Sequence, residues 1–451
     1  MRICIIGTGY VGLVTGTCFA EIGHEVICID KDQKKISRIL RGDMPIYEPG
    51  LKELVESNLR ARRLSFHSDV AEAAKLGCTF YFIAVGTPCR VDDGGADLGH
   101  VYAAAEEAAL AIKRQAAKDD FFPVFVTKST VPVGTSREVA RIVELHLNGE
   151  GFAVASNPEF LREGCAIEDF MAPDRIVVGS RSEKARALLE ELYRPLTRQG
   201  RPLVVTTTVE TAEMTKYAAN AFLAMKISFI NELSRLCEKI GADVEELALG
   251  MGLDKRIGDK FLKVGPGYGG SCFPKDTVAL IKTANDFQSP VEIVETVVRV
   301  NNRHMKFMSD KIRHAFGGTV SGKRIAVLGL AFKARTDDVR DSPALTIVPV
   351  LLSEGAVIIA YDPVANHNAK ALMGGTVLHY AASLSEALEG ADGAVIITEW
   401  DEFRRADWRG LALTMANPLL VDLRNLFSLQ EAGSMGIRYV SLGREPIAPS
   451  S

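Results

Sequence analysis

Short apolar runs alternate with helical patterns near both ends of this chain. Residues 3–6 and 25–29 are rich in β-branched side chains, which is typical of strands buried in a parallel sheet, and a helical pattern lies between them up to residue 22. Further apolar runs of the same kind occur at residues 80–85, 124–126, 153–155, 323–330, 356–361, 393–397 and 419–422. This alternation indicates an α/β protein with two Rossmann-like, doubly wound domains.

A long stretch without glycine or proline separates the two sets of strands. Residues 203–240 carry a capping-box pattern at Thr207 and Glu210 and end before Gly241, so we expect one central helix of roughly thirty residues. Its apolar residues are spread around most of the circumference, which requires cover on more than one side. We therefore expect a homodimer in which a partner subunit covers part of this helix.

Two polar residues interrupt the apolar surface of this helix. Lys216 and Asn220 are four residues apart and share a face. A lysine stem lying on apolar surface and a solvent-facing asparagine would explain them structurally. Two polar groups amid so many apolar ones favour the other interpretation, that they line a cavity.

Composition and charge narrow the class of protein. The chain has 451 residues, 47% hydrophobic and 24% charged, with a net charge of −4, so it resembles an ordinary globular protein and shows no basic excess for nucleic acid. Its eight cysteines form no CxxC pair and no disulfide framework, which disfavours a metal site and favours the reducing cytoplasm. The uncharged run 3–20 contains four glycines and precedes Glu21, so we expect a strand and a helix there rather than a membrane span.

The turn after the first strand carries the pattern Gly7-x-Gly9-x-x-Gly12, and Asp30 ends the second strand. The glycines allow a tight turn, approach of a pyrophosphate and helix packing, while the acid binds the adenosine ribose hydroxyls. The glycine pattern alone is a weak signal, but its strand, helix and acid favour dinucleotide binding over a plain glycine-rich loop. Asp30 would repel a 2′-phosphate, which favours NAD over NADP, although the lysines after it leave NADP open. One of them, Lys35, is placed to reach the cofactor phosphates.

Polar loops follow three of the predicted strands. Thr87, Thr130 and Glu159 lie in these loops, at the carboxyl ends where doubly wound sheets bind their ligands. They are site candidates, although each residue type also serves as a cap or turn residue.

A glycine-rich loop precedes the cysteine that we expect to carry the chemistry. Four of the six residues 265–270 are glycine, and Lys275 and Asp276 follow Cys272. A nearby cation favours the thiolate and hence a nucleophile. A buried cysteine in a tight turn is the alternative, because free cysteines are usually buried.

The C-terminal strands lack a GxGxxG pattern and have Gly329-Leu330-Ala331 at the equivalent turn. We expect this domain to bind another nucleotide-like group. Lys333, Arg335 and Arg340 are candidates for its phosphates, unless they belong to an ordinary charged loop.

Together these motifs resemble those of the nucleotide-sugar dehydrogenases, the UDP-glucose/GDP-mannose dehydrogenase family, nearly from end to end. The ordered set that carries the resemblance is GTGYVG at 7–12, PIYEPGL at 45–51, VGTP at 85–88, KSTVP at 128–132, NPEFLREG at 157–164, KYxxN at 216–220, RIG at 256–258, CFPKD at 272–276 and FK at 332–333. The resemblance implies that two NAD molecules in turn oxidise the C6 alcohol of a sugar nucleotide to a carboxylate. It also implies an NAD-binding domain at 1–200, a central helical dimerisation region with the cysteine loop at 201–308, and a UDP-sugar-binding domain at 309–451.

The resemblance assigns roles to individual residues. Cys272 would attack the C6 aldehyde to give a thiohemiacetal and then a thioester, with Lys216 favouring the thiolate. Lys216 and Asn220 would stabilise the developing oxyanions. Asp276, Thr130 and an ordered water would handle protons, and Glu159 would be the base for thioester hydrolysis.

The resemblance also implies two sets of binding residues. For the cofactor these are Gly7, Gly9, Tyr10, Val11, Gly12, Asp30, Lys35, Thr87, Thr130, Glu163, Lys275 and Arg340. For the sugar nucleotide they are Phe160, Leu161, Lys216, Asn220, Arg256 from the partner subunit, Lys263, Gly269, Phe332, Lys333 and Arg424.

UDP-glucose is the expected substrate, and GDP-mannose is the alternative. Phe160 and Leu161 argue against the branch of the family that acts on N-acetylated sugars. A two-electron hydroxyacid dehydrogenase would use Lys216 and Asn220 without a thioester. A non-catalytic NAD-binding scaffold would need none of Cys272, Lys216 and Glu159.

Overall fold

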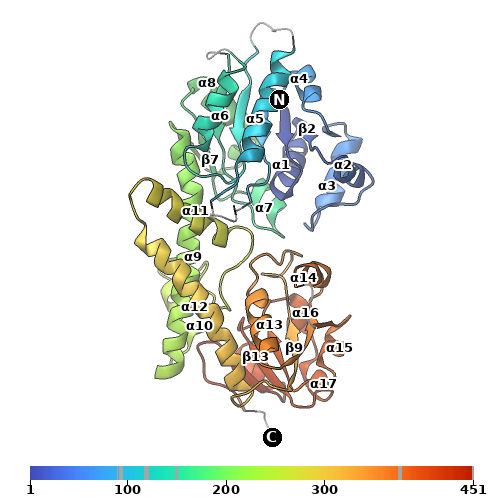
Figure 1. Cartoon of the computed structure of the whole chain (residues 1–451), viewed down its shortest axis with the longest axis vertical. Coiled ribbons are helices and arrows are strands. Elements are labelled where there is room, and N and C mark those ends of the chain that lie inside the picture. Colours follow the sequence, from blue (N-terminus) through green and yellow to red (C-terminus); the bar gives the residue numbers. More distant parts are fainter. Residues whose placement is uncertain (89, 91–94, 116–120, 148–150, 374–377, 449–451) are drawn as a thin grey trace. The chain divides into compact units, whose positions relative to one another are not determined.

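The computed structural model describes residues 1–88, 90, 95–115, 121–147, 151–373 and 378–448. The chain divides into two compact units, each built around one sheet (Figure 1). The first unit comprises Met1–Ala219 and Lys282–Phe287, and the second comprises Asn220–Ile281 and Gln288–Ser451.

The sheet of the first unit has eight strands within the described residues. Their order is β3-β2-β1-β4-β5-β6-β7-β8, with parallel neighbours except for β6 and β7, which pair antiparallel. The first six strands therefore have the order of a dinucleotide-binding sheet. The strands are β1 (Arg2–Ile6), β2 (Glu25–Ile29), β3 (Leu64–His67), β4 (Phe80–Ile83), β5 (Val124–Thr127), β6 (Ala153–Ser156), β7 (Ile176–Gly179) and β8 (Leu203–Thr206).

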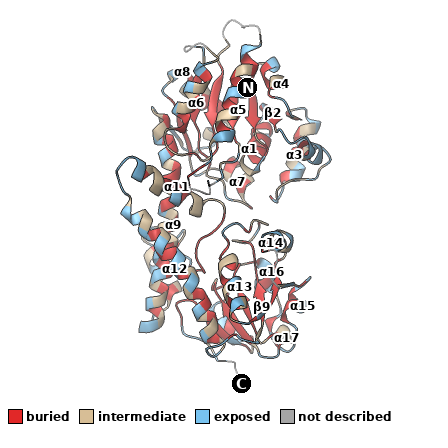
Figure 2. Cartoon of the chain, viewed as in Figure 1, coloured by how far each residue is buried: buried red, intermediate tan, exposed pale blue. Residues whose placement is uncertain are grey.

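Helices cover both faces of this sheet, so its central strands β4 and β5 are buried on both sides (Figure 2). Successive residues of a strand point to opposite faces, and accordingly Ile3 and Ile5 join one apolar core while Cys4 and Ile6 join another. Helices α1, α3 and α7 pack together, as do α4, α5 and α6. The helices are α1 (Tyr10–Glu21), α2 (Gln33–Leu40), α3 (Leu51–Arg60), α4 (Ala71–Leu76), α5 (Gly99–Lys113), α6 (Thr135–Glu144), α7 (Ala166–Met171) and α8 (Glu183–Thr197).

The sheet of the second unit repeats this strand order. It runs β11-β10-β9-β12-β13-β14, and all its neighbours are parallel. The prediction of two Rossmann-like sheets is confirmed. The strands are β9 (Arg324–Leu328), β10 (Val357–Tyr361), β11 (His379–Tyr380), β12 (Gly393–Ile396), β13 (Leu419–Asp422) and β14 (Arg438–Ser441).

The long central helix is α9 (Val209–Ile240), with 32 residues, and it confirms the predicted length. The predicted capping box at Thr207 was wrong by one residue, because the Thr208 hydroxyl accepts the hydrogen bond from the Thr211 N–H at 3.3 Å. Residues 203–206, which precede it in the same stretch without glycine or proline, form β8 and pair with β7. β-branched residues there favour a strand over a helix. Gly241, with φ of 73°, ends the helix as predicted.

The remaining helices of the chain follow α9. Among the described residues, no helix is both long and apolar enough to cross a membrane. These helices are α10 (Val244–Gly252), α11 (Phe273–Asp286), α12 (Glu292–Ala315), α13 (Pro343–Ser353), α14 (Asn366–Leu372), α15 (Leu384–Leu388), α16 (Asp401–Arg405), α17 (Trp408–Ala412) and α18 (Leu429–Gly433).

Candidate active site

The turn between β1 and α1 needs its glycines for two different reasons. Gly7 has φ of 101°, and a Cβ on it would lie 2.6 Å from the Ala84 carbonyl oxygen. A Cβ on Gly12 would lie 1.9 Å from the Gly7 carbonyl oxygen, so only glycine lets α1 start this close to the turn. In contrast, a Cβ on Gly9 would meet no atom within 4 Å, which leaves open space in front of the first turn of α1.

A cavity of about 570 Å³ lies beside this turn. Gly7, Gly9, Asp30, Lys35 and Gly86 are among the residues that line it. A bare backbone turn at a helix N-terminus, with an acid at the next strand end, is the cradle that a dinucleotide pyrophosphate and ribose require. These residues therefore fit the predicted cofactor.

Asp30 connects the glycine turn to α2. One carboxylate oxygen accepts hydrogen bonds from the Thr8 N–H at 2.9 Å and the Thr8 hydroxyl at 2.6 Å. The Lys35 ammonium lies 2.8 Å from the same oxygen, and the Asp32 N–H binds the other oxygen. Burial raises the pKa of Asp30, but Lys35, Thr8 and Asp32 outweigh burial and lower it to about 2. The carboxylate is therefore ionised at neutral pH, as NAD selection requires.

Tyr10 meets a residue that sequence reasoning named only as part of a motif. Its hydroxyl donates a very short hydrogen bond to the Glu48 carboxylate, which also accepts from the Gly164 and Ala166 N–H groups. Burial raises the pKa of Tyr10, and Glu48 raises it further. Glu48 is buried and thereby joins the glycine turn to the loop that contains Glu163. The PIYEPGL motif was the available signal, but a sequence does not show which carboxylate turns inward.

Thr87 and Thr130 lie together where β4 and β5 end. The Thr87 hydroxyl donates to the Thr130 carbonyl oxygen at 3.0 Å, so the two loops that carry the predicted cofactor residues are in contact. Ser129 reinforces the contact by donating to the Val85 carbonyl at 2.7 Å.

Glu159 and Lys216 form a buried ion pair. The Lys216 Nζ lies 2.9 Å from Glu159 Oε1, and the Leu161 N–H donates to Oε2 at 2.6 Å. Burial raises the pKa of Glu159, but Lys216, Leu161 and Lys128 reverse the effect and hold it below its ordinary value. The Lys216 Nζ also lies 5.4 Å from the centre of the Phe160 ring. Lys216 thus meets two predicted site residues within the first unit, Glu159 and Phe160.

Lys128 is a buried cation that sequence reasoning did not select as a site residue. Its Nζ donates to Asn157 Oδ1 at 3.0 Å, and Asn157 is also bonded to Tyr193. Burial lowers the pKa of Lys128 to about 8, Glu159 partly offsets this, and Lys216 adds to it. Its place in the KSTVP motif was the signal, but the motif does not show that the side chain is buried.

Asn220, Asp276 and Lys275 form a second polar group, in the second unit. The Asn220 amide donates to Asp276 Oδ2 at 2.6 Å, and the Lys275 Nζ lies 2.8 Å from Oδ1. Asp276 is buried, so both its oxygens have charged or polar partners in place of water.

Cys272 immediately precedes α11. Its carbonyl accepts the hydrogen bond from the Asp276 N–H at 2.9 Å, which makes Cys272 the N-cap of this helix. The thiol is partly exposed and lies 3.6 Å from the Ser271 hydroxyl. The N-terminus of a helix favours a negative charge, which suits a thiolate nucleophile.

Two glycines of the cysteine loop are required by close packing of the backbone. A Cβ on Gly269 would lie 2.0 Å from the Asp341 carbonyl oxygen, and one on Gly270 would lie 2.6 Å from the Phe332 ring. Gly267 has φ of 123°, which favours glycine for its backbone alone.

Three residues predicted to bind the sugar nucleotide gather after β9 and β13. Arg424 donates to the Phe332 carbonyl at 2.9 Å, and the Lys333 Nζ lies 5.4 Å from the Phe332 ring centre. Arg340 forms a bidentate pair with Asp338 instead, and its side chain is exposed. Lys263 is exposed, and the Arg256 side chain is 89% exposed and pairs with Asp254.

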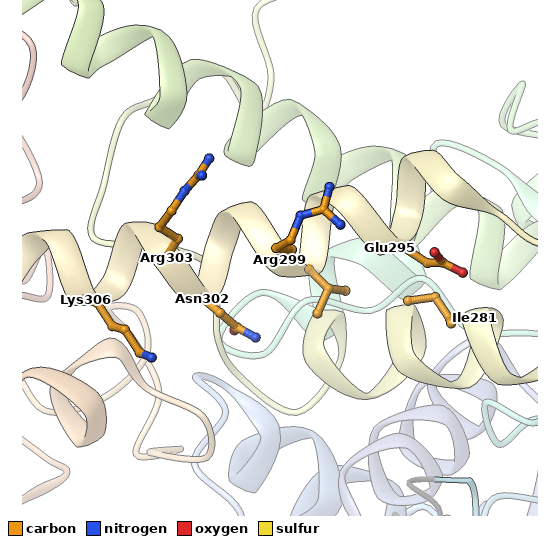
Figure 3. Close-up of a pocket in the computed structure, with 7 residues that line it drawn as sticks. Ile281, Glu295, Arg299, Asn302, Arg303 and Lys306 are labelled. Carbon is orange, nitrogen blue, oxygen red and sulfur yellow. The ribbon is translucent and has the colours of Figure 1, made fainter.

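A separate groove runs along α12 and holds none of the predicted site residues (Figure 3). Arg299, Arg303 and Lys306 line it together with Ile281 of α11. The predicted residues therefore gather at the strand ends and at the start of α11, and not in this groove.

The first unit has a glycine turn beside a cavity, with Asp30 at the next strand end. The second unit has a thiol at a helix N-terminus and a sheet of the same strand order. These features are typical of a dinucleotide-dependent dehydrogenase. Sequence models of one family match almost the whole chain: its NAD binding domain at residues 1–197, its central domain at 210–303 and its UDP binding domain at 326–429. The chain belongs to the UDP-glucose/GDP-mannose dehydrogenase family, and its cofactor is NAD.

Individual relatives agree with this assignment. UDP-glucose 6-dehydrogenase of Rhizobium meliloti (strain 1021) is 53% identical over 98% of this chain and 100% of its own length. UDP-glucose 6-dehydrogenase TuaD of Bacillus subtilis (strain 168) is 47% identical over 99% of this chain and 94% of its own. A solved UDP-glucose dehydrogenase from Pyrobaculum islandicum superimposes with a TM-score of 0.87, at 38% identity and 95% coverage of both chains.

Proposed function

We propose that this chain oxidises UDP-glucose at C6 to UDP-glucuronate, with two molecules of NAD reduced for each sugar. The observation that carries the proposal is a partly exposed thiol at the start of α11, one turn before a buried aspartate that Asn220 and Lys275 hold. The names of relatives with 53% and 47% identity support the substrate. When bound, NAD supplies the hydride acceptor for both oxidations.

Cys272 provides the covalent step. Its sulfur forms a bond to C6 of the aldehyde, and the carbonyl oxygen takes up a proton, which gives a thiohemiacetal. Loss of a hydride from C6 and of the hydroxyl proton then leaves a thioester. Water attacks this carbon, the C–S bond breaks with the electron pair leaving on sulfur, and the carboxylate remains.

The polar groups around these steps have complementary tasks. Lys216 and Asn220 stand four residues apart on α9 and stabilise the oxyanions. Asp276 and Thr130 hold and move protons with a water. The ionised Glu159 carboxylate, held by Lys216, accepts the proton of the hydrolytic water.

The chain's binding residues divide by domain. Residues 1–200 hold NAD through the glycine turn, Asp30, Lys35, Tyr10, Val11, Thr87 and Glu163, and Lys275 and Arg340 add cations. Residues 201–308 carry the dimer helix and the cysteine loop, and residues 309–451 hold the uridine nucleotide through Phe332, Lys333 and Arg424. Phe160, Leu161, Lys263 and Gly269 complete the sugar-nucleotide contacts.

The decisive test is the yield of NADH per mole of limiting UDP-glucose, with GDP-mannose and UDP-N-acetylglucosamine run in parallel. We expect two equivalents with UDP-glucose alone. One equivalent would leave a two-electron dehydrogenase without a thioester, activity on GDP-mannose alone would reassign the substrate, and no NADH with any sugar would indicate a binding protein.

The covalent step has its own test. Cys272→Ala removes the sulfur, so we expect loss of UDP-glucuronate with NAD binding retained, measured by product chromatography and calorimetry. Cys237→Ala is the matched control, because Cys237 is a buried thiol on α9 outside the proposed chemistry, and it keeps activity. Full activity in Cys272→Ala would exclude the covalent mechanism.

We also propose that the chain is a cytoplasmic homodimer. Phe222, Phe229 and Leu236 recur every seven residues on α9 and are all exposed, which is the spacing of a helix that packs on a second helix. A second copy would cover this stripe and bring its Arg256, which projects into solvent in one chain, to the sugar nucleotide. The described cysteines are thiols, which fits the reducing cytoplasm.

Sedimentation tests the dimer. Phe229→Glu places a charge in the apolar stripe and should yield monomers with little activity. Leu145→Glu, at an even more exposed leucine after α6, should leave the dimer intact. A Phe229→Glu protein that sediments as a dimer would refute this interface.

A further inference from the structure

Helix α12 presents two different polar faces. One face lines the groove of Figure 3 with Arg299, Asn302, Arg303 and Lys306. The other face is buried and carries Asn301 and His304, which are 3% and 2% exposed. Neither buried residue belongs to the chemistry described above. Burying a polar side chain costs free energy unless the side chain is hydrogen-bonded.

Asn301 and His304, together with Asn231 of α9, bind the backbone of the cysteine loop, and we call these three residues the loop clamp. Asn301 binds both main-chain groups of Tyr268: its Oδ1 accepts from the N–H at 2.9 Å, and its Nδ2 donates to the carbonyl at 3.1 Å. Asn231 Oδ1 accepts from the Gly265 N–H at 2.9 Å, and His304 Nε2 lies 2.8 Å from the Gly265 carbonyl. Four buried hydrogen bonds thus fix two residues of a segment without regular structure.

The path between these two anchors is equally restricted. A Cβ on Gly267 would lie 2.8 Å from Met305 Cγ and 3.1 Å from Asn301 Oδ1, so the backbone runs directly over α12. Beyond Tyr268, the Gly270 N–H donates to the Arg340 carbonyl at 2.9 Å. The loop is therefore anchored before, within and after its bend, two residues ahead of Cys272.

Burying the clamp side chains costs free energy, because two of their polar atoms are left without hydrogen-bond partners in the part of the chain that the structure describes. His304 Nδ1 and Asn231 Nδ2 are buried and have no hydrogen-bond partner among the described residues. Burial lowers the pKa of His304 to about 4, so the ring is neutral and its Nε2–H is the donor to Gly265. An apolar side chain would avoid the unpaired atoms. These residues are therefore better explained by what they hold than by packing.

We propose that Asn231, Asn301 and His304 are positioning residues that hold the Gly265–Gly270 backbone so that the Cys272 thiol is kept in place for attack on the sugar aldehyde. The proposal rests on the covalent mechanism put forward above. It differs from that mechanism in needing no contact between the clamp and substrate, cofactor or thiol.

The neighbouring asparagines of α12 provide a matched pair of variants. Asn301→Leu keeps a side chain branched at Cγ and removes both bonds to Tyr268, whereas Asn302→Leu makes the same change on the exposed face one residue later. We expect Asn301→Leu to speed hydrogen exchange at the Tyr268 amide and to lower kcat about ten- to hundredfold, because small displacements of a reacting group have effects of this size. The KM for NAD should stay unchanged, and Asn302→Leu should match the unaltered protein.

A second pair of variants, at His304, tests the proposal independently in case Asn301→Leu does not fold. His304→Leu removes the donor to Gly265, and His304→Gln restores an N–H at the end of a side chain. We expect His304→Leu to lower kcat and to change the rate at which iodoacetamide alkylates Cys272, and His304→Gln to recover both in large part. Assays run well below each melting temperature separate this effect from lost stability.

Two results would overturn the clamp: unchanged amide exchange and kcat in both Asn301→Leu and His304→Leu, or losses that His304→Gln does not recover although it folds. Failure of the covalent mechanism would look different. In that case Cys272→Ala would stay active, while the exchange at Tyr268 would still respond to Asn301→Leu.

Discussion

The two sheets share one strand order, and both end their second strand with an aspartate, yet the two aspartates are used differently. Asp30 lines the cavity beside the glycine turn and is bonded to Thr8, Asp32 and Lys35. Asp362 is fully enclosed, and its two oxygens accept from the Leu330, Ala331, Val364 and Ala365 N–H groups and the Trp400 indole. Both acids bond their own turn, but Asp30 also borders an open cavity, whereas Asp362 is enclosed by the groups that it holds.

The turns before these acids differ in the same way. A Cβ on Gly9 would meet nothing within 4 Å, so a pyrophosphate has room there. The equivalent turn of the second sheet is filled, because a Cβ on Gly329 would lie 2.4 Å from Thr398. Topology alone therefore does not decide where a nucleotide binds. The decision depends on whether the turn and its acid satisfy each other or leave groups for a ligand.

The largest expected effect comes from adding a side chain at the packed glycine of the turn between β1 and α1. In Gly12→Val the new side chain starts 1.9 Å from the Gly7 carbonyl oxygen, so α1 must move away from the turn. We expect NAD affinity to fall by about a hundredfold or more, because backbone approach to the pyrophosphate is lost. Calorimetry with NAD measures this.

Gly9→Ala is the comparison for that variant. Its Cβ clashes with no atom of the chain, although it takes up some of the room left for the pyrophosphate, so it should retain more NAD affinity than Gly12→Val. Binding of UDP-glucose, which we propose for the second sheet, should survive in both. Equal losses in the two glycine variants would show that the contrast between packed and open glycines has no functional meaning.

Removing the enclosed acid Asp362 should lower the stability of the protein and leave its affinity for NAD nearly unchanged. Asp362→Ala leaves several buried N–H groups without an acceptor, and we expect about 4 kcal/mol of destabilisation in denaturant titrations. NAD affinity should hardly change below the unfolding range. A variant that keeps its stability but loses NAD would reverse the roles assigned to the two aspartates.

Sequence patterns predicted the sheets and the glycine turn because these depend on local signals. The predicted first and last residues of the strands at 25–29 and 419–422 are confirmed, because apolar runs flanked by polar residues mark the ends of a strand clearly. The strand at residues 203–206 was missed, because these residues become a strand only by pairing with β7. Pairing of this kind depends on distant residues, which local propensity does not contain.

The candidate site was predicted in its residue types but not in its partners. Lys216 and Glu159 were both named from their motifs, yet nothing in the sequence shows that they pair at 2.9 Å. Lys128 and the clamp residues were missed because a lysine in a loop or an asparagine on a helix is usually exposed. Their burial depends on three-dimensional packing.

A smaller effect is expected from neutralising the accessible acid. Asp30→Asn keeps the shape of the side chain and removes its charge, so we expect about tenfold weaker NAD binding and a relative gain for NADP, whose 2′-phosphate is no longer repelled. Comparing both cofactors by calorimetry or initial rates measures the shift. Asp362→Asn, as the control, should leave the NAD to NADP ratio unchanged, and an equal shift in both variants would contradict the assignment.

The smallest expected effect is on the pH dependence of stability. It concerns another pair of equivalent strand ends, because β5 of the first sheet leads to the buried cation Lys128, whereas β13 of the second sheet ends in the buried acid Asp422. The pKa of Lys128 is about 8 when folded and 10.5 for an ordinary lysine, so between these values the unfolded chain binds more protons than the folded one. Stability should therefore rise with pH in this interval and be lost as pH falls through about 8, by about 1 kcal/mol over the unit from pH 8 to 9. Lys128→Met should flatten this slope in denaturant titrations. Asp30→Asn should not change it, because Asp30 has a pKa of about 2 and is ionised throughout the range. A slope that persists in Lys128→Met would mean that another group titrates.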